Sequence, residues 1–440
     1  MNMLQIDDRD WNLSRAEFAD AIAKGLGRAL LYVQRYGLDR VKDLVLNACL
    51  HDLSYDIQCS NSRSKWLFAM FANSPDYLEF RDKILSKLSK EPESYNDLYQ
   101  ICSIVKEIAL AGDLLAIEKL TERVYYYSAQ PNTDDWVGAN ALIEIQGIDA
   151  ALELSRIFGR RLLVNSNDSV PDDLDLYFFK NMSEEWISIF DRHVRTEESI
   201  ATYYKSLVDS KLNRERECAE QALQPKKTIS LAKIIDLARH KKHEYPFIYM
   251  RFGQKNATLE ELETVFSLLL NEPDEEICLR LLWVFRRAPI PRLAERLFEW
   301  VDSPTDLLRT AALQALAQIS NDRIYQLGRS KLAKGQITGA DTDTLDLFIN
   351  NYHAGDAELI LSKLQAVEID PEDLHAIGFS IFYISEQQVN PELVILLEWI
   401  YDRTPCCICR DRTIEQLKIY QPLPARILTE YQFDSRKWDT

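Results

Sequence analysis

The 440-residue sequence has few residues that end helices or build hairpins, with only 13 glycines and 15 prolines. Runs of β-branched residues and Asn-Gly turns, which mark β-hairpins, are absent. No apolar stretch approaches the ~18 residues of a transmembrane helix. The N-terminal residues Met1–Asp8 have no basic region followed by an apolar run, so we predict no signal peptide. These absences favour an all-α protein of the reducing cytoplasm, in which the eight scattered cysteines stay as thiols.

The sequence also lacks the short motifs that bind phosphates or carry catalysis. It has no phosphate-cradling glycine-rich loop, no Gly-x-Ser-x-Gly elbow and no His-Glu-x-x-His zinc motif. The formal net charge of −17 argues against a general nucleic-acid binder, because phosphate binding needs a positive surface. We therefore expect a protein with no cofactor and no enzymatic activity, and with no membrane association.

What the sequence does contain is a clear helical pattern in its C-terminal half. Asp302-Ser-Pro304 is a typical helix start, with an acceptor side chain followed by proline in the first turn. The apolar residues that follow recur at three and four positions along one helical face: Leu308, Ala311, Ala312, Ala315, Leu316 and Ile319. Because alanines let another helix approach closely, this helix is expected to lie within a stack.

The start of this helix is repeated elsewhere in the chain. Proline is followed five residues later by arginine at Pro304–Arg309 and again at Pro405–Arg410, whereas Pro273–Cys278 has cysteine at the arginine position. This pattern resembles the second helix of a HEAT repeat. Periods of roughly 30–45 residues with two helices each are typical of an α-solenoid. The resemblance implies a right-handed α-solenoid of divergent HEAT-like helical hairpins.

Two features divide the chain. The polar segment Val164–Asp173 interrupts the regular helical pattern, and the helix predicted at Glu197–Ala222 is unusually long. We therefore predict an N-terminal helical-repeat half at 1–165, a linker with long helices at 166–225 and a C-terminal HEAT-like half at 226–440. In that last part, the aromatic tail Tyr431–Trp438 is expected to close the final repeat as a capping unit.

The N-terminal part opens with a predicted helix and a polar loop. The Ser14–Glu17 capping box predicts a helix that runs to about Tyr36. The polar stretch that follows, a Tyr-Asp-x-Gln-Cys…Ser-Arg…Leu loop, resembles uncharacterised bacterial HEAT-like proteins over about the first 165 residues, a resemblance that implies no known activity. In this loop Asp56, Gln58 and Arg63 either brace neighbouring helices by hydrogen bonds or contact a partner, and we take them as candidate partner-binding residues.

Charge changes sign abruptly in the middle of the chain. Residues 225–255 contain eight lysines or arginines against two acids, and residues 256–276 contain seven acids and no base. Either the two segments neutralise each other, or the first is a docking site for an acidic protein partner. The candidate docking residues are Arg239, Lys241, Lys242 and Arg251.

Three cysteines near the C-terminus invite a metal interpretation. Cys406, Cys407 and Cys409 crowd one helical turn, with no histidine close by in the sequence. A structural zinc site usually has two separated cysteine pairs, or cysteine and histidine at compatible spacing. We therefore expect core or surface thiols here and no metal.

Together these patterns predict a non-enzymatic scaffold or protein-binding solenoid that docks a partner through its concave or charged faces. One alternative is an enzyme on a HEAT-like fold, such as a DNA glycosylase or lyase, which would need a positive concave face bearing Trp and Asp. Another is an inhibitor or immunity-type binder of one cognate protein.

Overall fold

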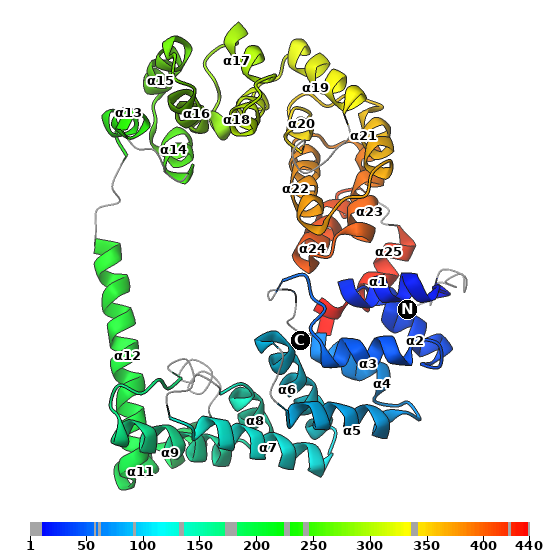
Figure 1. Cartoon of the computed structure of the whole chain (residues 1–440), viewed down its shortest axis with the longest axis vertical. Helices are drawn as coiled ribbons and strands as arrows, with labels where there is room; N and C mark the ends of the chain where they lie inside the picture. The colour runs from blue at the N-terminus through cyan, green and yellow to red at the C-terminus, as the bar shows by residue number, and fades with distance from the viewer. Residues whose placement is uncertain are drawn as a thin grey trace. The chain divides into compact units, whose positions relative to one another are not determined.

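The computed structural model describes residues 11–56, 59, 63–90, 94–131, 136–171, 183–223, 229–240, 246–335, 342–420 and 424–438. These ranges contain helices and turns and no β-strand, which confirms the predicted all-α class (Figure 1). Among the described helices, none combines the length and apolar character that a bilayer span requires. The chain divides into two compact units. Unit 1 comprises Met1–Pro225 and Ala425–Thr440, and unit 2 comprises Lys226–Pro424.

In unit 1, helices pack on their second neighbours as well as on adjacent ones. Thus α4 contacts α6, α6 contacts α8, and α7 contacts α9. The helices are α1 (Arg15–Lys24), α2 (Gly27–Tyr36), α3 (Lys42–Leu50), α4 (Arg63–Phe71), α5 (Tyr77–Leu88), α6 (Tyr95–Leu110), α7 (Leu114–Ser128), α8 (Ala139–Gln146), α9 (Ile148–Val164), α11 (Glu184–Thr196), α12 (Glu198–Leu223), α25 (Ala425–Tyr431) and the short 3₁₀ helix η7 (Ser435–Trp438).

The first predicted helix is two helices. Ser14 and Glu17 form the expected capping box at the start of α1, but α1 ends at Gly25, which has φ +73°. Glycine adopts that left-handed conformation without steric cost. The Gly25 N–H donates hydrogen bonds to the carbonyl oxygens of Ala21 and Ile22, which is a common way for a helix to end. The prediction of one helix to Tyr36 is therefore wrong, because Gly25 ends the helix that the apolar pattern continues.

The C-terminal tail packs on the N-terminal helices of its own unit, so the expectation that it closes the final repeat is wrong (Figure 1). The Trp66 indole donates to the carbonyl of Phe433 at 2.9 Å. Arg28 contacts the buried Glu430 carboxylate at 2.6 Å, and an ideal Cβ on Gly27 would lie 1.9 Å from the Glu430 carbonyl oxygen. The C-terminal part predicted at 226–440 corresponds to unit 2 only up to Pro424, because the residues from Ala425 onward belong to unit 1.

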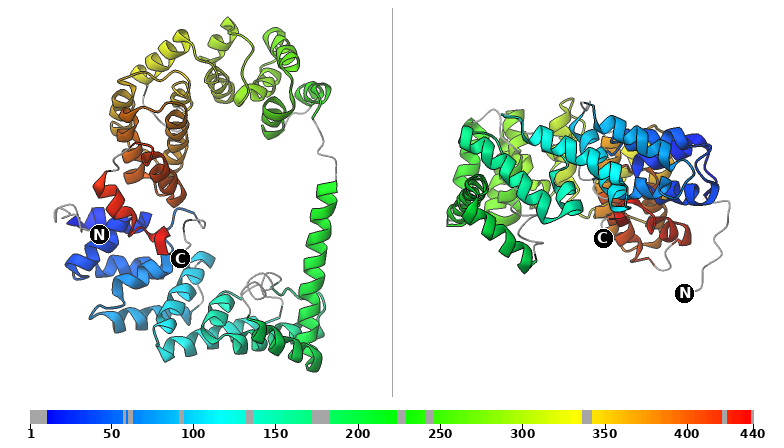
Figure 2. Two further views of the ribbon diagram at one scale, coloured as in Figure 1. Left: turned by 180° about the vertical axis from the view of Figure 1, so that it is seen from behind. Right: turned by 90° about the horizontal axis from the view of Figure 1, so that it is seen from below.

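The long helix α12 packs closely along α9 (Figure 2). Its 26 residues match the long helix predicted at Glu197–Ala222. On α9, the small buried residues Ala151, Ser155 and Gly159 follow one another at four-residue spacing, which places them on one face. An ideal Cβ on Gly159 would lie 1.8 Å from the Ser199 carbonyl oxygen, so the two backbones meet at this glycine.

Unit 2 contains a row of five helices, α16, α18, α20, α22 and α24 (Figures 1 and 2). Each helix of the row contacts the following helix of the row, from α16 with α18 to α22 with α24. The predicted apolar face of α18 lies in this core, and Ala312 is fully buried. The elements are α13 (Leu231–His240), α14 (Phe247–Arg251), the π-helical turn η3 (Phe252–Asn256), α15 (Leu259–Asn271), α16 (Glu275–Leu282), η4 (Trp283–Arg286), α17 (Glu295–Trp300), α18 (Asp306–Leu316), α19 (Asp322–Lys334), α20 (Asp343–Asp346), α21 (Asp356–Gln365), α22 (Pro371–Gln387), η6 (Pro391–Leu393), α23 (Val394–Arg403) and α24 (Cys407–Leu417).

The two proline-to-arginine pairs share one local hydrogen bond. Arg309 Nη1 donates to the carbonyl of Ser303 at 3.1 Å, and Arg410 Nη1 donates to the carbonyl of Thr404 at 3.2 Å. In both cases the acceptor is the residue before the proline. The arginine thus ties the first turn of its helix to the incoming chain, which explains the five-residue spacing.

The divergent third copy keeps the same bond with other donors. The Cys278 thiol, at the arginine position, lies 3.3 Å from the carbonyl oxygen of Glu272, the residue before the proline. Arg296 of α17 also donates to this carbonyl, and its other terminal nitrogen donates to Leu270 O at 2.6 Å. A guanidinium from another helix therefore replaces the missing arginine.

Candidate binding pocket

Side-chain amides in unit 2 connect successive helix ends. Helix C-terminal carbonyl groups have no partner within their own helix, so neighbouring groups must satisfy them. Gln318 donates to Arg286 O at 3.1 Å, Asn350 to Ala317 O at 2.7 Å, and Gln388 to Ile349 O at 3.4 Å. In these three bonds the donor and acceptor are 32, 33 and 39 residues apart, respectively. Each separation is about the length of one pair of helices. We call Gln318, Asn350 and Gln388 the amide ladder.

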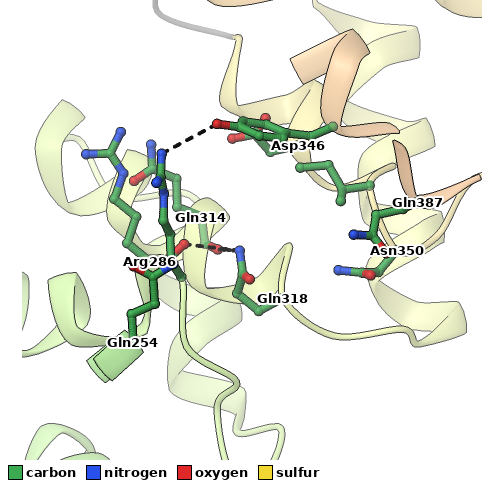
Figure 3. Close-up of a pocket in the computed structure, with 10 residues that line it drawn as sticks. Gln254, Arg286, Gln314, Gln318, Asp346, Asn350 and Gln387 are labelled. Atoms are coloured by element: carbon green, nitrogen blue, oxygen red, sulfur yellow. Dashed lines mark hydrogen bonds between the residues drawn. The ribbon is translucent and has the colours of Figure 1, made fainter. Parts of the chain in front are cut away.

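A pocket of about 490 Å³ lies beside this ladder within unit 2 (Figure 3). Its size is within the usual range for ligand sites, although its lining is more polar than usual. Five of the ten lining residues carry amides. The lining comes from η3, η4, α18, α20, α22 and the turns after η4, α18 and α20. It consists of Gln254, Arg286, Arg287, Gln314, Gln318, Asp346, Ile349, Asn350, Tyr383 and Gln387.

The pocket has arginines on one side and side-chain amides on both sides. Figure 3 places Arg286 and Gln254 on one side and Asn350 and Gln387 on the other. Arg287 Nη2 lies 3.5 Å from the Tyr383 hydroxyl, at the outer limit of a hydrogen bond. The two adjacent arginines supply donors for an anionic group, and the amides can both donate and accept.

Asp346 is the carboxyl group of the pocket. It is half-buried, and Ser380 Oγ donates to its Oδ1 at 2.6 Å. Desolvation by burial raises the pKa of Asp346 to about 6, partly opposed by the Ser380 hydrogen bond and by the positive charge of Arg286. Since a protonated carboxyl can donate as well as accept, the hydrogen-bonding character of the pocket changes near pH 6.

A smaller cavity of about 310 Å³ lies in unit 1. It is lined partly by α6 and α8 and includes the exposed Tyr95 and Tyr99. Its charged lining residues Lys106 and Glu144 form an ion pair at 2.9 Å, so they satisfy each other.

The N-terminal candidate residues do not form one surface. Arg63 is 1% exposed, its guanidinium donates to the carbonyl of Ile22, and it lies 5.8 Å from the centre of the Trp66 ring. The partner-binding interpretation of Arg63 is therefore wrong, because its side chain joins α4 to α1 inside unit 1. Asp56 is exposed and Gln58 lies outside the described residues, so for these two residues partner contact stays a prediction.

The basic candidate residues are only partly described. Arg239 in the last turn of α13 and Arg251 at the end of α14 are both exposed, as a docking role requires. Lys241 and Lys242 lie outside the described residues. Docking through this segment stays a prediction.

The acids expected to neutralise this segment have other roles within the described structure. Glu263 pairs with Arg292, and Glu261 forms a capping box with Thr258 at the start of α15. Mutual neutralisation therefore receives no support from these two carboxylates.

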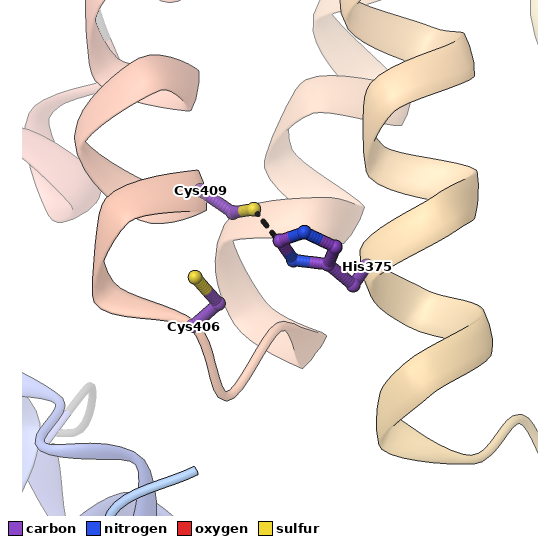
Figure 4. A group of neighbouring side chains, drawn as sticks. All are labelled: His375, Cys406 and Cys409. Atoms are coloured by element: carbon purple, nitrogen blue, oxygen red, sulfur yellow. Dashed lines mark hydrogen bonds between the residues drawn. The ribbon is translucent and has the colours of Figure 1, made fainter. Parts of the chain in front are cut away.

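The cysteine cluster does have a neighbouring histidine. His375 Nδ1 of α22 lies 3.3 Å from Cys409 Sγ, and one ligand atom from each of His375, Cys406 and Cys409 lies within 4.8 Å of the other two (Figure 4). His375 is 34 residues upstream of Cys409, far from the neighbouring positions at which a zinc-ligand spacing is recognised in a sequence. That separation is about one repeat, so a search at the repeat spacing could have found it.

No protein-family model matches the chain, and no curated protein shows significant similarity to it.

Proposed function

We propose that the protein is a non-enzymatic α-solenoid scaffold that binds a partner protein through the amide-lined pocket of unit 2. The observation that carries this proposal is the pocket itself, in which five amides and two arginines from successive helical pairs face one space of about 490 Å³. Side-chain amides match the donor and acceptor groups of a polypeptide backbone. An extended segment of a partner, rather than a compact small molecule, fits a lining spread over several repeats.

The repeat character of the solenoid is supported by two periodic features. Each helix of the row α16, α18, α20, α22 and α24 contacts the following helix of that row. In the amide ladder, the donor and acceptor of each hydrogen bond are 32–39 residues apart in the sequence. The shared bond before Pro273, Pro304 and Pro405 supports divergent HEAT-like units. The resulting fold would grow along one axis and present one helix of each pair to the partner.

The charges favour a partner segment with an acidic side chain. Arg286 and Arg287 are adjacent at the pocket, and guanidinium groups bind carboxylates by paired hydrogen bonds. We place this interaction in the cytoplasm, since all eight cysteines lie in the described ranges and none forms a disulfide.

Site-specific crosslinking in the native host tests the proposal. A photoreactive phenylalanine derivative at Tyr383 should capture one protein, and the same residue at Tyr99 in the unit 1 cavity is the control. Arg287→Glu should reduce capture at position 383 by about 5-fold to 100-fold, the usual loss for an interface anchor. Arg403→Glu, an exposed arginine of α23 outside the pocket lining, should leave capture unchanged. Equal capture at 383 and 99, or no effect of Arg287→Glu, would contradict the proposal.

One observation favours a second function, acid–base catalysis in the same pocket. Perturbed carboxyl groups cluster at active sites, and Asp346 has a pKa of about 6 beside two arginines. An enzyme of the DNA glycosylase type would bind duplex DNA with a steep salt dependence. Anisotropy with labelled duplex DNA distinguishes the two functions: binding that requires Arg286 and Arg287 favours the enzyme, and no binding favours the scaffold.

A further inference from the structure

The side chains of His375, Cys406 and Cys409 converge from two packed helices of unit 2 (Figure 4). His375 lies in the second turn of α22, Cys406 is the N-cap residue of α24, and Cys409 lies in the first turn of α24. The three-residue separation of Cys406 and Cys409 places both thiols on one side of the helix start. Cys407 lies between the two cysteines in the sequence and is also buried, but its thiol is not one of the three converging groups.

The separations fit the edges of a tetrahedral zinc site. With Zn–S bonds of about 2.3 Å and Zn–N bonds of about 2.0–2.1 Å, ligand atoms lie about 3.6–3.8 Å apart. In this group all three ligand atoms are within 4.8 Å of one another, and the Cys409–His375 separation is 3.3 Å. Side-chain movements of about an ångström or less would bring the three ligand atoms around one ion.

The surrounding structure holds the two cysteines in place. The Arg410 guanidinium donates to the carbonyl groups of Thr404 and Pro405 at 3.2 and 3.4 Å, which fixes the turn before α24. The Cys406 amide lies 3.3 Å from Thr404 Oγ1. Cys406 and Cys409 are 5% and 3% exposed, respectively, so the two thiols are largely shielded from water, whereas His375 is half-buried. The start of a helix also favours the anionic thiolate, which is the form that binds metal.

We propose that His375, Cys406 and Cys409 bind one Zn²⁺ ion through three protein ligands, with a fourth position open to water or an external ligand. Both thiols lose their protons on binding, so each ion bound releases two protons, and the imidazole binds as the neutral ring. The ion joins α22 to α24, the helices that carry Tyr383 of the pocket and the repeated Pro405–Arg410 motif. The expectation of no metal from the sequence is revised accordingly, while the proposed partner binding is a separate question.

Cobalt substitution tests the site in the full chain. The reduced, chelator-treated protein is titrated with Co²⁺, which reports thiolate ligation by a charge-transfer band in the near ultraviolet and tetrahedral geometry by visible bands. One equivalent should bind, and one equivalent of Zn²⁺ should remove the bands. At 100-fold excess of zinc over its Kd, the melting temperature should rise by about 5–10 °C.

Variants locate the bound ion. Cys406→Ser and Cys409→Ser should each abolish the charge-transfer band or shift it to one-thiolate intensity, and His375→Gln should weaken binding at least about 10-fold. Cys407→Ser is the matched control, because this buried neighbour lies outside the group and should leave binding unchanged. Circular dichroism confirms that each variant is folded.

Two measurements on the wild-type chain remain informative if the variants fail to fold. Native mass spectrometry should show one zinc added and two protons lost, and zinc X-ray absorption should show two sulfur and one or more nitrogen or oxygen ligands. No bound zinc, zinc without sulfur ligands, or a band unaffected by Cys406→Ser and Cys409→Ser would overturn the proposal. Conversion of the cysteine pair into a disulfide in the presence of zinc would also overturn it.

Discussion

Replacing Gly159 with alanine tests the close packing of α9 against α12. Gly159 is buried in the middle of α9, where alanine would otherwise be favoured by about 1 kcal/mol. The new Cβ would lie 1.8 Å from the Ser199 carbonyl oxygen, 2.4 Å from its carbonyl carbon and 2.9 Å from its Cα. These are backbone atoms of α12, so no flexible side chain can move aside.

The expected loss of stability follows from that geometry. Ordinary contacts begin near 3.4 Å, so the two helices must separate locally by more than an ångström. Overpacking of this kind costs about 1–3 kcal/mol and occasionally more. A clash with backbone at 1.8 Å belongs in the upper part of that range, about 2–3 kcal/mol. The gain in helix propensity offsets about 1 kcal/mol of this cost, so Gly159→Ala should destabilise unit 1 by roughly 1–2 kcal/mol.

Gly378 in α22 provides the matched control. It is also a buried glycine within a helix, but its Cβ would meet Phe382 and Ile400 atoms at 3.7–3.9 Å, an ordinary contact distance. Gly378→Ala should therefore stabilise unit 2 by about 0.5–1 kcal/mol.

Scanning calorimetry and urea unfolding followed by circular dichroism measure both variants. We expect one transition to move down for Gly159→Ala and another to move up for Gly378→Ala. If Gly159→Ala melts at or above the wild-type temperature, or if both variants shift in the same direction, the inferred backbone contact is wrong.

Three further predictions concern other contacts. Ala312 is fully buried in α18, so Ala312→Leu should overpack the core of unit 2 and lower its stability by about 1–3 kcal/mol. An unchanged melting temperature would contradict that packing. Trp66→Phe should cost about 1–3 kcal/mol because it leaves the Phe433 carbonyl without its indole donor, and more rapid proteolysis after α24 would report release of the tail. Since folding raises the pKa of Asp346 from 3.8 to about 6, the folded state holds the proton more tightly than the unfolded state. The free energy of unfolding of the wild type should thus fall as pH rises from about 4 to 6. Above pH 6 the Asp346→Asn variant should have a free energy of unfolding about 1–3 kcal/mol higher than that of the wild type, and below pH 4 the two should be equal. Urea unfolding across this range measures the difference, and a pH-independent difference would refute it.

Local patterns in the sequence predicted the helices well. The predicted capping box at Ser14 is present, and the long helix Glu198–Leu223 begins and ends within one residue of its prediction. These features depend on interactions within a few residues, so the sequence carries them directly. The alanine face of α18 was also predicted correctly, because its period requires only that one side of the helix be buried.

Contacts between distant residues could not be predicted in this way. Nothing near Arg63 indicates that Ile22 will accept its hydrogen bond, and nothing near Cys409 indicates His375. The pocket amides were missed because Gln314 and Gln318 are ordinary polar residues on their own helix. Their role depends on the neighbouring helical pairs, whose spacing varies between 32 and 39 residues along the amide ladder.

The packing of the tail on α2 and α4 has a consequence for how the chain is made. A ribosome that has delivered α1 to α12 must still add roughly 200 residues of unit 2 before it delivers α25 and η7. At about 5–20 residues per second, that interval lasts about 10–40 s. During this time Trp66, fully buried in the finished protein, lacks the backbone carbonyl that accepts its indole proton. Unit 1 is begun first and completed last, so premature termination anywhere in unit 2 leaves both units unfinished.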